Sequence, residues 1–239
     1  MWYSLRRSVL RCRKYVPGLA RQQRREEMVG PLGHWNELRQ YQLTALKKCG
    51  LQPDHRLLDV GCGPLQGGIA FIQYLNPGRY VGVDINSGKL GEGYAQIAEF
   101  GLTPKNPRLI LSKRFGVEEL ERARFDYIWA SQILYYFDPP VMRELLDFIA
   151  AHLAPGGRFL GDILGTCDDE FRTERHLAWM NRVQRHTVEG LQALAAEVGL
   201  TVQSLGRIDA FGYPRDLNLR SNLLLETRAK AGPGSPACF

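Results

Sequence analysis

The segment Leu57-Leu58-Asp59-Val60-Gly61-Cys62-Gly63-Pro64 decides how this chain of 239 residues is interpreted. Its apolar start predicts a buried strand, and two glycines one residue apart predict a turn that brings the backbone close to a ligand. A second strand, Tyr80–Asp84, ends in an acid 21 positions after Gly63. In an open α/β sheet both turns lie at the carboxyl edge, where a carboxylate can bind the hydroxyls of a ribose.

The glycine turn does not fit a dinucleotide-binding enzyme. The pattern GxGxxG requires glycine at position 66, where this chain has Gln66, and Pro64 follows the second glycine directly. Proline has no N–H to offer a pyrophosphate at the start of a helix. A nicotinamide or flavin enzyme is therefore disfavoured.

Strand and helix signals alternate along most of the chain, and this pattern predicts a parallel sheet with helices on both faces. A helix over 34–49 comes first, and the tail 230–239 is expected to fray. Residues 206–220 have no helical periodicity, so the last strand is expected to return antiparallel. The remaining strands are expected at 56–60, 80–84, 108–112, 125–130, 158–163, 201–205 and 221–227, and the helices at 66–75, 89–100, 140–153 and 187–198. Pro155-Gly156-Gly157 predicts a turn, and Asp138 with the prolines after it predicts a helix start.

The positive charge of the chain lies at its N-terminus. Residues 1–27 hold eight of the 31 basic residues and two of the 25 acidic ones, so the rest of the chain has no net charge. Apolar residues from Trp2 to Leu19 recur at helical spacing, and Pro17 with Gly18 is expected to break that pattern. This arm, residues 1–29, can pack on the domain, lie on an anionic membrane, or act as a floppy or targeting segment. A domain-wide nucleic-acid surface is disfavoured.

Five cysteines, widely spaced and without a CxxC or a Cys/His pair, indicate reduced thiols and no metal site. No stretch approaches 18 uncharged apolar residues, and the N-terminus lacks the apolar region of a secretory signal. We therefore expect a cytoplasmic protein, with a peripheral membrane contact through residues 1–27 as the alternative.

Four segments in order, LLDVGCGPLQGG, YVGVDIN, FDYIWA and LAPGGRFLGDIL, resemble the class I S-adenosylmethionine-dependent methyltransferases. The resemblance runs from about His34 to Thr227. It implies a Rossmann-like, doubly wound, mostly parallel seven-stranded sheet, with the last strand antiparallel and helices on both faces. It also implies a methyltransferase domain over 30–229, with a lid-like insertion at about 165–186 and S-adenosyl-L-methionine as the cofactor.

The resemblance assigns cofactor-binding residues by position. Gly61, Cys62 and Gly63 match the loop against the methionine part, Asp59 the acid that faces its amino group, and Asp84 the ribose-binding acid. Ile85 and Asn86 match the residues that flank the adenine. Ala130, Ser131 and Gln132 match the segment that lines the cofactor next to the substrate. Many relatives place an Asp or Asn after the third strand to contact adenine, but Ser112 and Lys113 stand there, so that contact is left unassigned.

The expected reaction is methyl transfer to an oxygen or nitrogen of a small molecule. An oxygen nucleophile needs a base, and the candidates are His176, His186 and Tyr135, although each is more typical of a surface or packing residue. Asp138-Pro139-Pro140 lies about eight residues after the fourth strand and lacks a following aromatic residue, which disfavours N-methylation of adenine or glutamine. The alternatives are a membrane-associated lipid or quinone methyltransferase, an RNA methyltransferase using the basic arm, and a cofactor-binding relative without activity. The sequence leaves the substrate and the oligomeric state unassigned.

Overall fold

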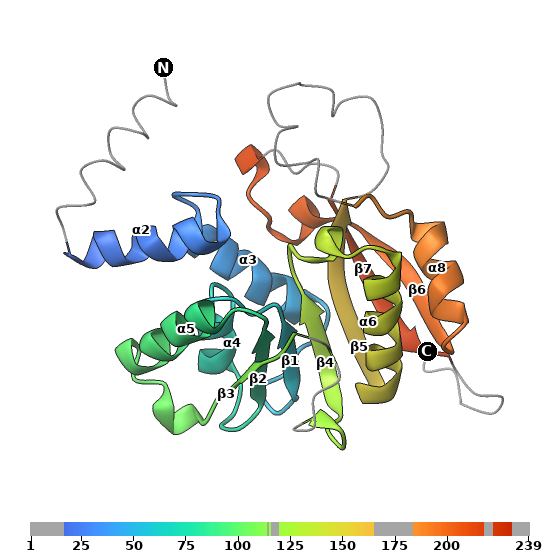
Figure 1. The fold of residues 1–239 in the computed structure, drawn as a ribbon, viewed down its shortest axis with the longest axis horizontal. Coiled ribbons are helices and arrows are strands. Elements are labelled where there is room, and N and C mark those ends of the chain that lie inside the picture. Colours follow the sequence, from blue (N-terminus) through green and yellow to red (C-terminus); the bar gives the residue numbers. More distant parts are fainter. Residues whose placement is uncertain (1–16, 114, 116–119, 165–183, 218–221, 231–239) are drawn as a thin grey trace.

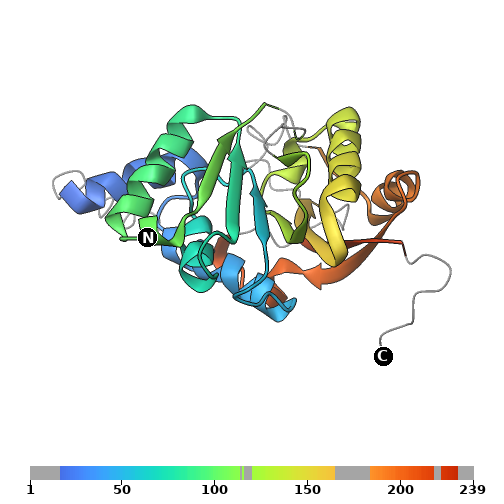
Figure 2. The same cartoon turned by 90° about the horizontal axis from the view of Figure 1, so that it is seen from below.

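The computed structural model describes residues 17–113, 115, 120–164, 184–217 and 222–230. Its strands form one seven-stranded sheet in the order β3-β2-β1-β4-β5-β7-β6, with β7 antiparallel to both of its neighbours (Figures 1 and 2). The strands are β1 (Leu57–Val60), β2 (Tyr80–Asp84), β3 (Arg108–Leu111), β4 (Phe125–Ala130), β5 (Leu153–Leu164), β6 (Leu200–Arg207) and β7 (Asn222–Ala229). The predicted doubly wound sheet with an antiparallel last strand is confirmed.

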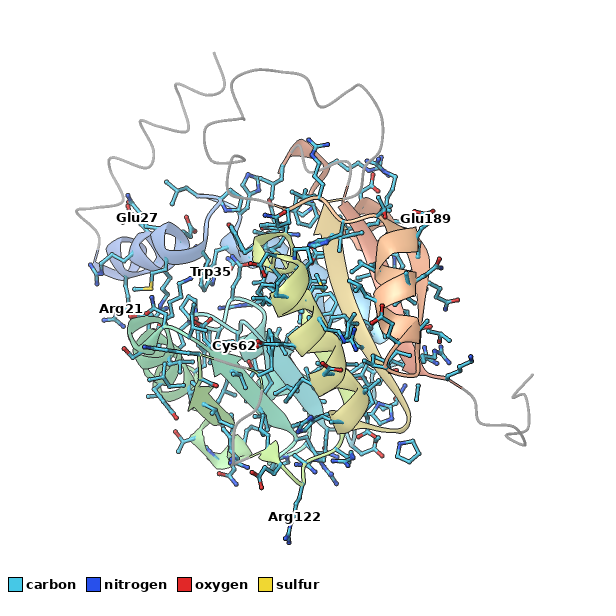
Figure 3. The ribbon with its side chains drawn as sticks, turned by 45° about the vertical axis from the view of Figure 1, so that its right-hand side comes forward. Arg21, Glu27, Trp35, Cys62, Arg122 and Glu189 are labelled. Carbon is cyan, nitrogen blue, oxygen red and sulfur yellow. The ribbon has the colours of Figure 1, made fainter. Side chains whose placement is uncertain are left out.

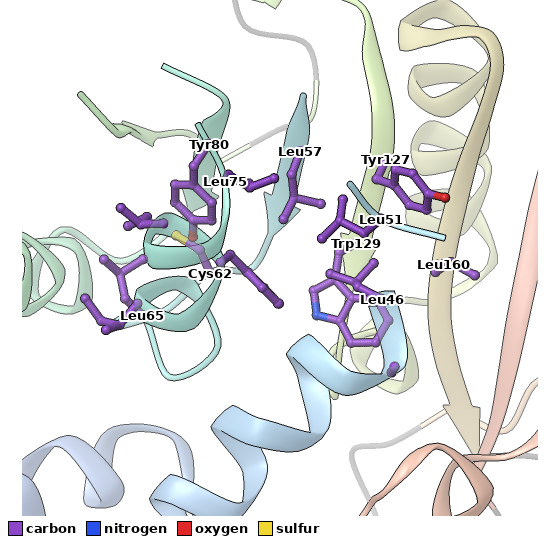
Figure 4. Packing of buried hydrophobic residues seen from close by; sticks show 14 of the residues in the cluster. Leu46, Leu51, Leu57, Cys62, Leu65, Leu75, Tyr80, Tyr127, Trp129 and Leu160 are labelled. Atoms are coloured by element: carbon purple, nitrogen blue, oxygen red, sulfur yellow. The ribbon is translucent and has the colours of Figure 1, made fainter. Parts of the chain in front are cut away.

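Helices cover both faces of the sheet. One apolar cluster joins α3 (Trp35–Lys48), α4 (Gly68–Tyr74) and α5 (Ser87–Glu99) to side chains such as Trp129 and Leu160 (Figure 4). The other joins α6 (Pro139–His152) and α8 (Val188–Ala196) to the opposite side chains of the same strands. Strand β1 is buried along its whole length because it lies between these two layers. The chain order reverses between β1 and β4, so the crevice at their carboxyl ends is where this fold binds ligands.

The predicted turn at Pro155-Gly156-Gly157 is wrong, because this segment belongs to β5. Strand β5 begins at Leu153, directly after α6, and pairs with β4 from Phe125 onward. The register shifts between Phe125 and Tyr127, which marks a bulge that absorbs the glycines without ending the strand. Gly157 is required there, since a Cβ on it would lie 2.8 Å from the carbonyl oxygen of Phe125.

Helix α6 begins as the sequence predicts. The Asp138 side chain accepts a 3.0 Å hydrogen bond from the backbone N–H of Val141, and Pro139 occupies the first helical position. Helix α8 is capped in the same way by Thr187, which accepts from Gly190. The segment before β7 contains two short 3-10 helices, η6 (Ile208–Phe211) and η7 (Arg215–Leu217), where the sequence predicted mostly loop.

The described half of the N-terminal arm is helix α2 (Pro17–Val29), which lies along α5 (Figures 1 and 3). Pro17 begins this helix, and the sequence pattern did not predict that a helix continues to Val29. The predicted amphipathic helix before Pro17 and most of the lid-like insertion lie outside the described residues. Among those described, no helix is both long and apolar enough to cross a membrane.

Candidate cofactor and acceptor site

The glycine turn between β1 and α4 is anchored to the end of β2. The backbone N–H groups of Gly61 and Cys62 both donate to the carbonyl oxygen of Val83, at 2.8 and 3.1 Å. Gly61 and Gly63 have φ of 72° and 54°, a conformation that glycine adopts without strain. The turn therefore holds its glycine backbone at the carboxyl edge of the sheet, as the sequence predicts.

Asp84 joins the two predicted halves of the site. One carboxylate oxygen accepts a 2.9 Å hydrogen bond from the N–H of Gly63, and the other accepts a 2.8 Å bond from the N–H of Asn86. Asn86 in turn caps α5 by accepting from Lys89. Asp84 is buried at the end of β2, so its charge is fixed beside the glycine turn. Both carboxylate oxygens also keep lone pairs for a further donor, such as a ribose hydroxyl.

Asp59 lies deeper in the same edge. The hydroxyl of Tyr80 donates a 2.8 Å hydrogen bond to its carboxylate. Burial raises the pKa of the Asp59 carboxyl to about 7; the Tyr80 bond acts in the opposite direction and the charge of Asp84 adds to the rise. Cys62 is buried against Gly82, where a Cβ would meet its sulfur at 2.8 Å, so it packs the turn through its side chain.

Two residues that the sequence did not single out hold the glycine turn from outside. Arg39, on α3, donates from Nε to the carbonyl oxygen of Gln66 at 2.9 Å and from its terminal nitrogen to Gln96 at 3.0 Å. Gln96, on α5, donates to the carbonyl oxygen of Pro64. Burial lowers the pKa of Arg39 to about 10. No local motif marks these residues, because their partners lie 27 to 57 positions away.

The segment after β4 turns sharply toward β5. Gln132 has φ of 59°, and its backbone N–H donates a 2.8 Å hydrogen bond to the carboxylate of Asp162, which also accepts from its side chain. The side chain of Ile133 then lies over the glycine turn: a Cβ on Gly61 would be 2.8 Å from its Cδ1. Ala130 is fully buried, and the hydroxyl of Ser131 is buried. The structure thus brings the predicted segment 130–132 beside the glycine turn and adds Asp162, which the sequence analysis missed.

Apolar side chains are exposed at the carboxyl ends of β2 and β3. Ile85 is 71% exposed and Leu111 is 55% exposed. Leu111 pairs in register with Asp84, so both side chains lie next to the ribose-binding acid of the prediction. Such exposed apolar groups can flank a flat, aromatic ring.

The predicted base candidates do not form a catalytic cluster among the described residues. The Nε2–H of His186 donates a 3.2 Å hydrogen bond to the carbonyl oxygen of Leu134. Burial lowers its pKa, while the carbonyls of Leu134 and Phe137 oppose that change. Tyr135 is buried, with a pKa raised first by burial and then by the charge of Asp162. His176 lies outside the described residues.

An open groove of about 560 Å³ lies between α3 and the segment before β7. Its lining residues are Asn36, Glu37, Gln40, Tyr41, Thr44, Gly212 and Pro214. The ring of Tyr41 packs edge-on against Tyr213, with centroids 5.1 Å apart. Among the described residues, the buried Tyr41 hydroxyl has no hydrogen-bond partner, although the Ser131 hydroxyl lies near it. Burial, and then the charge of Asp162, raises the pKa of Tyr41. One lining residue, Tyr41, also packs against Trp129 of β4, with ring centroids 6.4 Å apart.

Comparison with known proteins gives matches over the central part of the chain. Residues 58–159 match the family model described as a methyltransferase domain. A probable methyltransferase, ltbC, from Aspergillus luteorubrus is 31% identical over 105 residues, which are 42% of this chain and 37% of that protein. The chain thus matches little more than a third of the length of this curated relative.

Two solved structures illustrate the fold. Magnesium protoporphyrin IX methyltransferase from Synechocystis PCC 6803, with bound S-adenosylhomocysteine, has a TM-score of 0.61 at 14% identity, covering 94% of this chain and all of that one. The [4+2]-cyclase SpnF has a TM-score of 0.59 at 17% identity, covering 81% of this chain and 82% of that one. Residues 58–159 thus resemble a methyltransferase domain, and the two solved structures share the overall fold of this chain.

Proposed function

We propose that the chain transfers a methyl group from S-adenosylmethionine to an oxygen or nitrogen of a small molecule. The observation that carries this proposal is Asp84, whose two carboxylate oxygens tie the glycine turn to the end of β2. A cofactor with a ribose and an amino-acid chain fits such an edge, since the ribose hydroxyls meet Asp84 and the backbone of Gly61 and Gly63 allows close approach. Asp59, ionised, would face the ammonium group.

The residues present fit this cofactor in chemistry as well as in position. When bound, S-adenosylmethionine supplies a methyl group already activated by a sulfonium. The protein then has to hold the acceptor atom in line with that methyl group, and positioning of this kind contributes roughly 7–11 kcal/mol. The groove lined by Tyr41, whose ring packs against Trp129 of β4, is the proposed place for the acceptor.

The distribution of charge in the chain and the ion pairs of its N-terminal arm favour a small acceptor over RNA. The charge outside residues 1–27 sums to zero, and within the arm Arg25 is buried in ion pairs with α5. Part of the positive charge of the arm thus lies in ion pairs inside the molecule. SpnF, which has a similar fold, is described as a cyclase. Because a fold does not fix an activity, cofactor binding has to be tested directly.

The experiment is a thermal shift with S-adenosylmethionine and S-adenosylhomocysteine, compared between the parent and Asp84→Ala. A ligand at 100 times its Kd stabilises by about 2.7 kcal/mol. For a domain of this size the Tm should then rise by about 5–10 °C. We expect that rise in the parent and a smaller one in the variant.

No rise for a folded parent at millimolar ligand would refute the proposal. A rise of equal size in both proteins would refute the assignment of Asp84. After binding is established, transfer of a labelled methyl group to a panel of hydroxyl and amine compounds tests turnover.

A further inference from the structure

Over residues 21–29, helix α2 is attached to the domain through charged and polar side chains. Its buried side chains among residues 21–29 are Gln23, Arg25 and Glu26. Arg25 donates from Nε to Glu92 at 2.6 Å and from a terminal nitrogen to Glu99 at 2.7 Å, and its side chain is only 6% exposed. Both acids belong to α5. Because the two carboxylates are partly exposed, at 23% for Glu92 and 39% for Glu99, this contact is screened in part by salt, whereas apolar packing is not.

Glu99 occupies an unfavourable place for an acid in its own helix. It is the last residue of α5, where the helix dipole disfavours negative charge, and α5 has no basic residue in its last turn. Pairing with Arg25 lowers the pKa of the Glu99 carboxyl, and the hydrogen bond from Arg25 is the largest cause. The arrangement at this end of α5 therefore serves to hold α2.

The C-terminal end of α2 lies over the glycine turn. Val29 is its last residue, and a Cβ on Gly63 would be 3.4 Å from Cγ1 of Val29. Three apolar side chains around this end are partly exposed: Met28 at 38%, Val29 at 39% and Leu32 at 38%. The position of Val29 beside Gly63 gives its side chain a natural partner, namely the aliphatic chain of a ligand lying on that turn.

We infer that α2 forms one wall of the cofactor site, with Val29 against the amino-acid part of the cofactor and Arg25 as the residue that positions the wall. This inference rests on the proposed cofactor binding. Arg25 acts through α2 and does not itself contact the ligand. Over residues 21–29 the wall is held by ion pairs whose carboxylates are partly exposed, so salt should loosen it and speed release of the cofactor.

The test compares the Kd and dissociation rate of S-adenosylhomocysteine with those of 5′-methylthioadenosine, which lacks the amino-acid part. In Arg25→Gln the Kd for S-adenosylhomocysteine should rise about fivefold, because α2 is no longer held in place, while that for 5′-methylthioadenosine stays unchanged. Arg25→Lys should recover part of the affinity. The matched control is Arg24→Gln, which removes the same charge from an exposed neighbour without an ion pair to any described residue, and should bind like the parent.

Raising NaCl from 50 to 500 mM should weaken binding of S-adenosylhomocysteine to the parent more than to Arg25→Gln. Val29→Ala, at a partly exposed position that does not threaten the fold, should show the same preference for the methylthio ligand. If Val29→Ala and folded Arg25→Gln both bind S-adenosylhomocysteine like the parent, or if both ligands weaken equally, the inference is overturned. Failure of the parent to bind either ligand would instead contradict the proposed function.

Discussion

Tyr80 and Asp59 lie 21 residues apart and share a buried hydrogen bond of 2.8 Å between neighbouring strands at the candidate cofactor edge. Burial raises the pKa of Asp59 to about 7, despite the bond from Tyr80. A carboxyl group in this position changes charge near neutral pH. Any ligand that brings an ammonium group to Asp59 should therefore bind in a pH-dependent way.

Cofactor affinity should increase with pH through 7. At pH 6 only about a tenth of Asp59 is ionised, so S-adenosylhomocysteine should bind up to about tenfold more weakly than at pH 8. Calorimetric titrations from pH 6 to 8.5 measure this change. In Asp59→Asn binding should be weak at every pH, and in Tyr80→Phe the midpoint should move upward because the carboxylate loses a donor. Parallel profiles in parent and Asp59→Asn would contradict the assignment.

Folding stability should respond to the same group with the opposite sign. The pKa of Asp59 is about 7 in the folded state and near 3.9 in an unfolded chain, so between these values the unfolded state loses the proton first. The contribution of Asp59 to stability is complete below about pH 4 and is lost as pH rises through 7. Relative to the parent, Asp59→Asn should thus gain about 2–3 kcal/mol between pH 5 and 7.5, measured by urea unfolding. A constant difference between the two proteins would show that Asp59 does not titrate in this range.

Gly61→Ala and Gly78→Ala form a matched pair. The two glycines have φ of 72° and 74°, but a Cβ on Gly78 meets nothing within 4 Å, whereas one on Gly61 meets Ile133. Each substitution should cost about 1 kcal/mol for the left-handed backbone. Gly61→Ala should lose about 1 kcal/mol more, because a β-branched side chain moves stiffly, and should also weaken S-adenosylhomocysteine binding. Equal losses of stability and unchanged binding would place Ile133 farther from the turn.

Arg39→Lys should separate geometry from charge at the glycine turn. Lysine keeps the cation but lacks the planar group that reaches both the Gln66 carbonyl and Gln96. We expect a loss of about 1–2 kcal/mol in unfolding free energy, together with weaker S-adenosylhomocysteine binding. Lys47→Arg, on an exposed part of α3, serves as the control for a basic exchange in the same helix. Unchanged stability and affinity in Arg39→Lys would mean that a single hydrogen bond from residue 39 is enough to hold the glycine turn.

Asp162→Ala should be more damaging than Gln132→Ala. The aspartate variant leaves the Gln132 backbone N–H without its acceptor, whereas the glutamine variant removes only a side-chain bond. An unpaired buried N–H costs about 1–3 kcal/mol, so the difference in unfolding free energy should fall in that range. Chemical denaturation of both variants measures it. Similar losses of stability in the two variants would show that water accepts the hydrogen bond of the Gln132 N–H when Asp162 is removed.

The sequence predicted the parts of the molecule that rest on local signals. Gly61, Gly63 and Asp84 stand out because each ends or follows a strand, and the helix cap at Asp138 depends on residues three positions apart. The contacts of Arg39 with Gln66, of Asp162 with Gln132 and of Val29 with Gly63 join residues 27 to 34 positions apart, for which a single sequence carries no signal. The error at Pro155-Gly157 has the same origin, since pairing with β4 overrides a strong turn signal.

The position of β7 between β5 and β6 has a consequence for biosynthesis. β6 is made before β7, yet β7 is its only neighbour in the sheet, so β6 cannot pair until β7 has left the ribosome. Until then the edge of β5 also stays open, and such an edge invites pairing with other chains. Nascent chains that stop between β6 and β7 are therefore expected to bind chaperones or aggregate, while the parallel half of the sheet is already complete.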